Sequence, residues 1–195
     1  MSKILIAIPT FETIQPEVFK AVYDLRSAGH ELSFDFVKGY DCAVARNKIS
    51  VFAQSDGYDY VLMVDSDTII PPDTLELMLD SDVDICLGLC PRKNTKDGKS
   101  AMIKMSDMGY TDSWLYSELP NEKTEIKCGG FACALVKTSV LTALDYPYFQ
   151  YVTNQEGGTF SEDFYFCQNA RLMGYQVFMD PRVRCGHLAR YYQYE

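Results

Sequence analysis

The sequence contains no long uninterrupted hydrophobic run, and this absence excludes one class of protein at the outset. A membrane-spanning helix needs about 20 mostly apolar residues, and no window of the 195 residues approaches that composition. The first apolar stretch, Ile4–Ile8, ends at Pro9 and is too short for the core of a secretion signal. We therefore expect no transmembrane segment and a cytoplasmic location.

Basic residues and histidines are also scarce. The chain has 18 Lys and Arg against 27 Asp and Glu, which gives a formal net charge of −9, and it has only 2 histidines. This balance argues against nucleic acid or an anionic membrane as the main partner. A small anionic ligand is compatible with it where a metal ion or local arginines screen the charge.

Cysteine pairs with the spacing of a zinc site or a redox motif are missing as well. The 7 cysteines are an odd number without a Cys-x-x-Cys pair, and several lie inside apolar segments such as Ile85–Cys90. Reduced, buried thiols in a cytosolic protein are the simplest interpretation.

What is present is an alternation of apolar strands and amphipathic helices over the first ninety residues. This order favours parallel strands joined by right-handed crossovers. It predicts a single α/β domain over residues 1–195, with a mostly parallel central sheet, helices on both faces and a small mixed second half. Pro16 is expected to open the first helix and Gly29 to close it. The other expected elements of the first half are strands at Ile4–Ile8, Leu32–Val37, Val61–Val64 and Val83–Leu89, and helices at Cys42–Gln54 and from Pro71 onward.

The second half is less regular. Gly174 should end its last helix, and the segments Arg92–Lys99 and Gln155–Thr159 read as loops. The tyrosines at 191, 192 and 194 either pack on the body or stack on a ligand. The expected elements are strands at Ala101–Met105, Glu125–Cys128, Phe131–Val136 and Gln176–Met179, and helices at Thr138–Leu144 and Ser161–Met173.

The most informative segment is an apolar run that stops at two aspartates. Val61–Val64 reads as a strand buried on both faces, and it is followed by Asp65, Ser66 and Asp67. Strand alternation would place both carboxylates on one side, at the sheet edge where ligands usually bind. Such a pair suits a hard divalent cation or a phosphate bound through one. Alternatively, the aspartates only cap the following turn. An EF-hand calcium loop is excluded, because Ile69 occupies its fifth position.

Two further acidic residues, Glu162 and Asp163, follow Ser161 at the start of the last helix. A serine N-cap followed by acids in the first turn would explain this pattern by helix stability alone. In a functional interpretation, one carboxylate acts as a general base. Gly157–Gly158 would let the preceding loop approach a ligand.

Three other positions have both a structural and a functional interpretation. His187 is either structural or pairs with Asp67 as a Mn²⁺ ligand. Arg46–Asn47 forms either a solvated helix face or a contact from the guanidinium to an anionic ligand. Gly129–Gly130 is either a bend or a close approach for a sugar. Pro9–Glu12 leaves the first strand at the edge that carries Asp65, where it can contact a nucleotide base.

Together and in this order, these segments resemble the GT-A glycosyltransferases, most closely the short, single-domain, family-2-like enzymes. Each motif is weak alone, whereas their order and spacing are more specific. The segments that carry the resemblance are Ile6–Thr10, Ala45–Asn47, Tyr58–Asp67, Pro71–Asp73, Gly129–Phe131, Ser161–Asp163 with Phe166 and Cys167, and Gly186–His187.

The resemblance implies a hexosyltransferase-type enzyme that moves a sugar from a UDP- or GDP-sugar donor to a hydroxyl of an unidentified acceptor. Residues 1–90 would bind the nucleotide, and residues 91–195 would hold the acceptor and metal residues. Asp65, Asp67 and His187 would bind Mn²⁺ or Mg²⁺. Asp163, with Glu162 beside it, would match the base of inverting members, although retaining members share the same donor site. The residues implied for the nucleotide sugar are Pro9, Thr10, Phe11, Glu12, Arg46, Asn47, Asp65, Ser66, Gly129 and Gly130.

Three alternatives stay open at this point. A non-catalytic nucleotide-sugar binding module would keep the site but lack a productive base. Val61–Thr68 also resembles the strand-and-aspartate motif of haloacid-dehalogenase-like phosphatases, in which Asp65 would be the nucleophile and Asp67 the acid–base. In those enzymes the motif usually ends the first strand, whereas two strand–helix units precede it here. A nucleotidyltransferase would need a glycine-rich basic loop after the first strand, which the sequence lacks.

Overall fold

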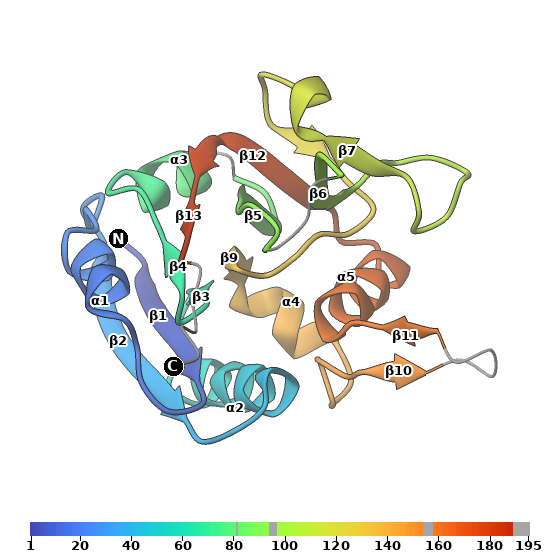
Figure 1. Ribbon diagram of the computed structural model, residues 1–195. Coiled ribbons are helices and arrows are strands. Elements are labelled where there is room, and N and C mark those ends of the chain that lie inside the picture. Colours follow the sequence, from blue (N-terminus) through green and yellow to red (C-terminus); the bar gives the residue numbers. More distant parts are fainter. Residues whose placement is uncertain (81, 94–96, 154–157, 189–195) are drawn as a thin grey trace, which may run out of the picture.

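The computed structural model describes residues 1–80, 82–93, 97–153 and 158–188 (Figure 1). Within them, the main sheet has seven strands in the order β2-β1-β3-β9-β5-β12-β8. Five strands run in one direction, and β9 and β8 run in the other. The predicted α/β fold with a mostly parallel sheet is therefore confirmed. The strands, in spatial order, are β2 (Glu31–Lys38), β1 (Lys3–Thr10), β3 (Tyr60–Val64), β9 (Cys133–Lys137), β5 (Ile85–Leu89), β12 (Val177–Arg184) and β8 (Thr124–Glu125).

Helices cover both faces of this sheet (Figure 1). Side chains alternate along β1 and β3, so that Leu5 and Met63 belong to one apolar cluster while Ile6 and Leu62 belong to the other. Helices α2 (Cys42–Ser55), α4 (Thr138–Ala143) and α5 (Glu162–Leu172) pack on the first face, and α1 (Pro16–Tyr23) and α3 (Thr74–Asp80) pack on the second. Apolar residues in continuous runs thus build central strands, β1, β3 and β5, that are buried on both sides, whereas the edge strand β2 is partly exposed.

The first helix is shorter than the sequence predicted. It ends at Tyr23, six residues before Gly29, so the expectation that Gly29 closes it is wrong. The reason lies outside the helix, because the amide of Arg26 donates to the carbonyl of Pro72 at 2.9 Å and draws the chain toward α3. Gly29 instead has a φ of +78° in the turn that leads into β2.

The insertion of β9 between β3 and β5 has the greatest consequence for the site. β9 runs antiparallel to both neighbours, with Val64 opposite Cys133 and Leu87 opposite Ala134. The backbone just before β9 therefore reaches the end of β3, where the amide of Asp65 donates to the carbonyl of Ala132 at 3.0 Å. A segment from the second half of the chain is thus held beside the two aspartates.

The remaining elements are short. They include three two-stranded sheets and a 3₁₀ turn, and no described helix is long and apolar enough to cross a membrane. Residues 94–96 and 155–157 of the two expected loops, and the tyrosines at 191, 192 and 194, lie outside the described residues. The short elements are β4 (Thr68–Ile69) with β13 (Gly186–His187), β6 (Lys99–Ile103) with β7 (Ser113–Leu115), β10 (Val152–Thr153) with β11 (Thr159–Phe160), and η1 (Tyr116–Glu118).

Candidate functional site

A pocket of 260 Å³ lies at the carboxyl ends of β1 and β3. Two of the three segments around it, Pro9–Phe11 and Asp65–Asp67, were predicted to meet at this edge, and they do. Sequence reasoning missed the third, Tyr40–Cys42, which precedes and starts α2. The available signal was Asp41, whose carboxylate caps α2 by accepting from the amide of Val44 at 3.1 Å. The residues that line the pocket are Pro9, Thr10, Phe11, Tyr40, Asp41, Cys42, Asp65, Ser66 and Asp67.

Thr10 and Glu12 differ in their relation to this pocket. Thr10 is buried, and its hydroxyl donates to the carbonyl of Thr13 at 2.8 Å, which leaves its oxygen as an acceptor. Glu12 is exposed and does not belong to the pocket lining. Of the predicted base-binding segment, the structure therefore brings Pro9–Phe11, but not Glu12, to the cavity.

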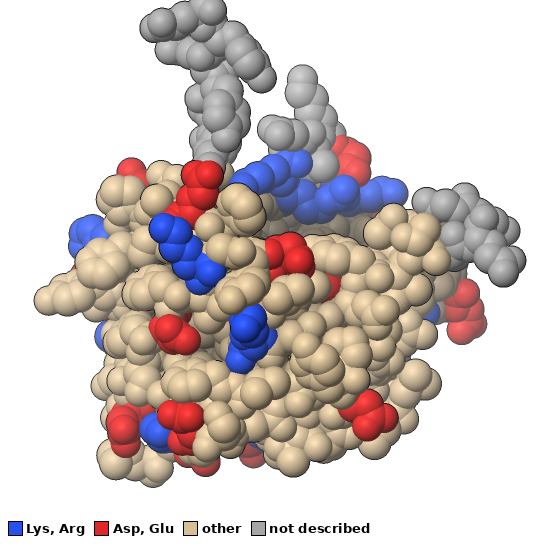
Figure 2. All heavy atoms as spheres, turned by 90° about the horizontal axis from the view of Figure 1, so that it is seen from below, with Lys and Arg blue, Asp and Glu red and all other residues tan. Residues whose placement is uncertain are grey.

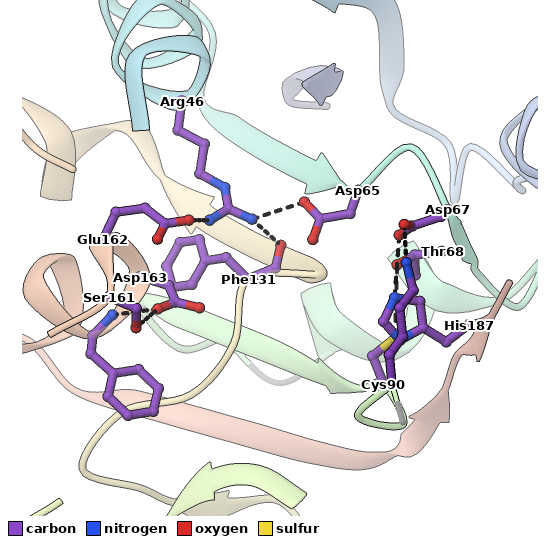
Figure 3. Close-up of polar contacts among 12 residues, drawn as sticks. Arg46, Asp65, Asp67, Thr68, Cys90, Phe131, Ser161, Glu162, Asp163 and His187 are labelled. Atoms are coloured by element: carbon purple, nitrogen blue, oxygen red, sulfur yellow. Dashed lines mark hydrogen bonds and ion pairs between the residues drawn. The ribbon is translucent and has the colours of Figure 1, made fainter. Parts of the chain in front are cut away.

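The two aspartates occupy a turn rather than the end of a strand. The amide of Thr68 donates to the carbonyl of Asp65 at 3.0 Å, which closes a turn over residues 65–68. Strand alternation therefore does not apply to them, and their side chains point to different partners. Figure 3 shows Asp65 directed at Arg46 and Asp67 directed at His187.

Arg46 is a buried guanidinium that joins three elements of the fold (Figure 3). Its side chain is 2% exposed, so the interpretation as a solvated helix face is wrong. Its Nη1 lies 2.6 Å from Oε1 of Glu162, and its Nη2 lies 2.8 Å from Oδ1 of Asp65 and 3.3 Å from the carbonyl of Phe131. Two carboxylates offset the cost of burying this charge. Arg46 is therefore placed to hold Asp65 and Glu162 in position.

The surroundings of Asp65 destabilise the charged form of its carboxylate. Burial raises the pKa of Asp65 above its ordinary value; Arg46 opposes this shift, and the neighbouring Asp67 adds to it. A cation placed near Asp65 would favour the charged form of its carboxylate.

Asn47 follows Arg46 in the sequence, but its side chain contacts a different segment, the chain after α4. Its Oδ1 accepts from the amides of Tyr148 and Phe149 at 2.9 Å and 3.0 Å, and its Nδ2 donates to the carbonyl of Phe149 at 2.8 Å. The side chain is buried and lies outside the lining of the pocket. These contacts give Asn47 a structural role in fixing the chain after α4.

Asp67 and His187 form a second constellation beside the pocket. Nε2 of His187 lies 3.2 Å from Oδ1 of Asp67, and Nδ1 lies 2.5 Å from the carbonyl of Pro91. A carbonyl only accepts, so Nδ1 donates, and the tautomer presents Nε2 toward Asp67. The backbone fixes the pair, because His187 is opposite Thr68 in the β4–β13 ladder and the amide of Leu188 donates to the carbonyl of Asp67 at 2.9 Å.

The donor set of this pair fits a divalent cation. A carboxylate oxygen and an imidazole nitrogen suit Mn²⁺, and metal-binding histidines usually donate their other ring N–H to a carbonyl or carboxylate, as His187 does to Pro91. Asp65 is engaged by Arg46 instead. Among the described residues, no three His, Cys, Asp or Glu side chains converge on one point. A metal here would therefore take its other ligands from phosphate and water.

The two acids at the start of α5 have different surroundings. Glu162 is 6% exposed and pairs with Arg46. Asp163 is half-buried and accepts from the hydroxyl of Ser161 and, at 2.8 Å, from the amide of Phe164. Ser161 is the N-cap residue of α5 and acids fill the first turn, as the sequence predicted, but the Ser161 side chain makes no hydrogen bond to the helix backbone. Asp163 is the more accessible carboxylate.

The two glycines before β9, Gly129 and Gly130, also have different roles. A Cβ on Gly129 would lie 2.4 Å from Sδ of Met102 and 2.8 Å from Cδ1 of Leu87, so close packing requires glycine there. A Cβ on Gly130 would lie 3.3 Å from Cβ of Ala101, a tight contact, and 3.7 Å from Oδ2 of Asp163, an ordinary one. Gly130 thus borders the carboxylate that is the candidate base.

The cysteines are all free thiols in the described structure, as predicted. Cys42 lines the pocket, and burial raises its pKa to about 12, so the thiol stays protonated at neutral pH.

The face shown in Figure 2 is mostly uncharged, with several Lys and Arg side chains gathered beside acidic ones at its upper edge.

The chain matches no protein-family model and no curated protein. Solved structures do resemble it. A197 from STIV has a TM-score of 0.66 at 15% identity, over 96% of this chain and 86% of that one. GalNAc-T7 with UDP, GalNAc and Mn²⁺ has a TM-score of 0.63 at 12% identity, over 97% and 44%. A mutant of Drosophila β1,4-galactosyltransferase 7 with manganese, UDP-Gal and xylobiose has a TM-score of 0.56 at 18% identity, over 97% and 72%.

These neighbours show that the chain has a GT-A-like fold. The predicted resemblance is confirmed at the level of the fold, which favours it over the phosphatase alternative. The chain spans 44% of the GalNAc-T7 chain, so this likeness concerns one part of that protein.

Proposed function

We propose that this chain is a metal-dependent glycosyltransferase that moves a sugar from a nucleotide-diphosphate donor to an acceptor hydroxyl. The observation that carries the proposal is the position of the pocket at the ends of β1 and β3. There, Pro9–Phe11 and Asp65–Asp67 meet, and the Asp67–His187 pair lies alongside. The GT-A-like fold supports it, because two of the similar structures contain UDP or a UDP-sugar together with manganese.

In this proposal the pocket holds the nucleotide. The backbone of Pro9–Phe11 and the hydroxyl oxygen of Thr10 contact the base and ribose, and Asp65, held by Arg46, faces the ribose. The N-terminus of α2 adds partial positive charge near Cys42. Asp67 and His187 would hold Mn²⁺ or Mg²⁺, which would neutralise the charge that grows on the departing diphosphate.

Asp163 is the proposed general base. In an inverting transfer, the acceptor oxygen forms a bond to the anomeric carbon as the bond to the diphosphate breaks, and Asp163 takes the hydroxyl proton. Three observations support Asp163 over Glu162: its carboxylate is half-buried, it borders Gly130, and it is free of the pair with Arg46 that engages Glu162.

Thermal unfolding with nucleotides tests the proposal directly. UDP or GDP should raise the melting temperature only when Mn²⁺ or Mg²⁺ is present, because the diphosphate binds through the metal. Ligand at 100 times its Kd stabilises a protein by about 2.7 kcal/mol. Equal stabilisation with and without metal, or none in either case, would contradict the proposal.

A panel of nucleotide sugars assayed for metal-dependent hydrolysis then separates an enzyme from a binding module. The enzyme should release nucleotide from one donor of the panel. A binding module would show the thermal shift with that donor but no turnover.

A further inference from the structure

The carboxylate of Asp67 has a nitrogen of another side chain beside each of its two oxygens. His187 Nε2 faces Oδ1 at 3.2 Å (Figure 3), and the ammonium of Lys93 pairs with Oδ2. The Lys93 side chain is 37% exposed and that of Asp67 is 27% exposed, so both can be reached from solvent. A cation of the protein therefore sits on the carboxylate that is the proposed metal ligand.

The backbone that carries Lys93 is fixed at several points. The carbonyl of Pro91 accepts from Nδ1 of His187 at 2.5 Å, and the amide of Arg92 donates to the Tyr116 hydroxyl at 3.1 Å. That hydroxyl donates in turn to the carbonyl of Cys90 at 3.4 Å. The segment 90–92 is thus tied to β13 on one side and to η1 on the other, which keeps the base of the Lys93 side chain beside Asp67.

The neighbouring basic residue has a different partner. Nη1 of Arg92 lies 3.3 Å from Oδ2 of Asp97, so Arg92 is directed away from the aspartate turn. Of these two adjacent basic residues, only Lys93 pairs with Asp67. A lysine suits a mobile role, because its charge is compact and lies on a flexible four-carbon stem.

We propose that Lys93 is a displaceable internal cation of the donor site. In the ligand-free protein it occupies Oδ2 of Asp67 and competes with the divalent metal for that carboxylate. When the metal binds, repulsion between the two cations at one carboxylate drives the ammonium away. It then pairs with the diphosphate, which lysine binds well as a point charge. The inference rests on the proposed function and names a positioning residue for it.

This exchange predicts two effects of opposite sign. Removing the ammonium should strengthen the binding of Mn²⁺ alone, because Asp67 loses a competing cation. The same change should weaken the binding of a nucleotide diphosphate at saturating Mn²⁺, because the diphosphate loses a cation. A merely structural contribution of Lys93 would weaken both.

The experiment compares the full chain with Lys93→Gln, Lys93→Arg and Lys99→Gln. Lys99 is an exposed lysine at the start of β6 and controls for the loss of one charge nearby. Free Mn²⁺ is measured by electron paramagnetic resonance in a titration without nucleotide. UDP and GDP are then titrated by calorimetry at saturating Mn²⁺.

We expect Lys93→Gln to bind Mn²⁺ about three- to five-fold more tightly, in keeping with the strength of a partly exposed ion pair. It should bind UDP or GDP with Mn²⁺ about five-fold more weakly. Lys93→Arg, which keeps the charge, and Lys99→Gln should both stay close to the unchanged protein.

The outcomes separate this inference from the function on which it rests. Unchanged or weaker Mn²⁺ binding in Lys93→Gln, with nucleotide binding intact in the unchanged protein, would overturn the inference alone. Tighter Mn²⁺ binding with unchanged nucleotide affinity would overturn the transfer of the ammonium to the diphosphate. If the unchanged protein bound neither Mn²⁺ nor any metal–nucleotide complex, the proposed function itself would fail.

Discussion

Glu162 and Asp163 are adjacent in sequence but have different surroundings. Glu162 is buried against Arg46, whereas Asp163 is half-buried beside Gly130. Asp163→Asn should therefore keep metal-dependent nucleotide binding and the melting temperature, and should lower sugar transfer by about 10²- to 10⁴-fold, the usual contribution of a general base. Transfer kinetics and thermal unfolding of the same preparation measure both quantities.

Glu162→Gln is the matched control, and we expect it to lose stability. It removes one of the two carboxylates that compensate Arg46, so the free energy of unfolding should fall by about 2–3 kcal/mol. Denaturant titration measures this loss. Normal transfer by Asp163→Asn together with inactive but stable Glu162→Gln would reverse the assignment of the base.

Asn47 was predicted to contact the ligand, but in the structure its side chain binds the backbone of residues 148 and 149. Asn47→Ala leaves two backbone amides and one carbonyl at residues 148 and 149 without their partner, so we expect a loss of about 3 kcal/mol in unfolding free energy. Asn47→Asp keeps the two accepting contacts and should lose less. Where Asn47→Asp is folded, its affinity for a metal–nucleotide complex should be unchanged; a large loss of affinity in a stable variant would make Asn47 a ligand contact.

At the scale of elements, the two glycines before β9 have different neighbours: Gly129 packs in the core, and Gly130 lies beside the site. Gly129→Ala should lower the unfolding free energy by about 1–3 kcal/mol, because its methyl group would overlap Met102 and Leu87. Gly130→Ala should lower stability less than Gly129→Ala, because the nearest atom to its methyl group would be Cβ of Ala101 at 3.3 Å, and it should affect transfer, since the methyl group would also lie beside Asp163. Equal stability of both variants in denaturant titrations would contradict this division.

The elements that could be predicted from sequence are those that local pattern determines. β1, β2, β3 and α2 lie where apolar runs and helical spacing placed them, within one or two residues at each end. The place of β9 between β3 and β5 could not be predicted, because strand pairing across seventy residues leaves no local signal. The end of α1 depends likewise on a contact of Arg26 with a distant carbonyl.

Within the site, too, features set by local pattern and strand topology could be predicted, whereas contacts between distant segments could not. The sheet edge that joins Pro9–Phe11 to Asp65–Asp67 follows from parallel strand topology. The burial of Arg46 was missed, because a polar side chain opposite the apolar face of a helix reads as solvated until a second layer is known to cover it. The Lys93–Asp67 pair joins residues 26 positions apart, and both lie in turns outside the helices and strands, so no local pattern predicts their contact.

At the scale of the whole molecule, the site draws on β1, α2, the turn after β3, α5 and β13, which are spread along the chain. Rigid elements therefore hold each group, and the sheet edge gathers them. The protein as a whole carries a net charge of −9, so its long-range field repels an anionic nucleotide. The proposed nucleotide binding would then depend on local positive charge at the pocket.

This charge balance, together with the small number of metal donors, predicts strong coupling between metal and nucleotide. Asp67 and His187 offer two donor groups, and the diphosphate would supply others, so each ligand completes the site of the other. We expect Mn²⁺ to bind at least about 10-fold more tightly in the presence of UDP or GDP, and by reciprocity the nucleotide should gain the same factor from Mn²⁺. Calorimetric titrations around the full cycle measure both arms. Asp67→Ala should abolish the coupling, whereas Asp163→Asn should preserve it; independent binding of the two ligands in the unchanged protein would place the metal away from the diphosphate.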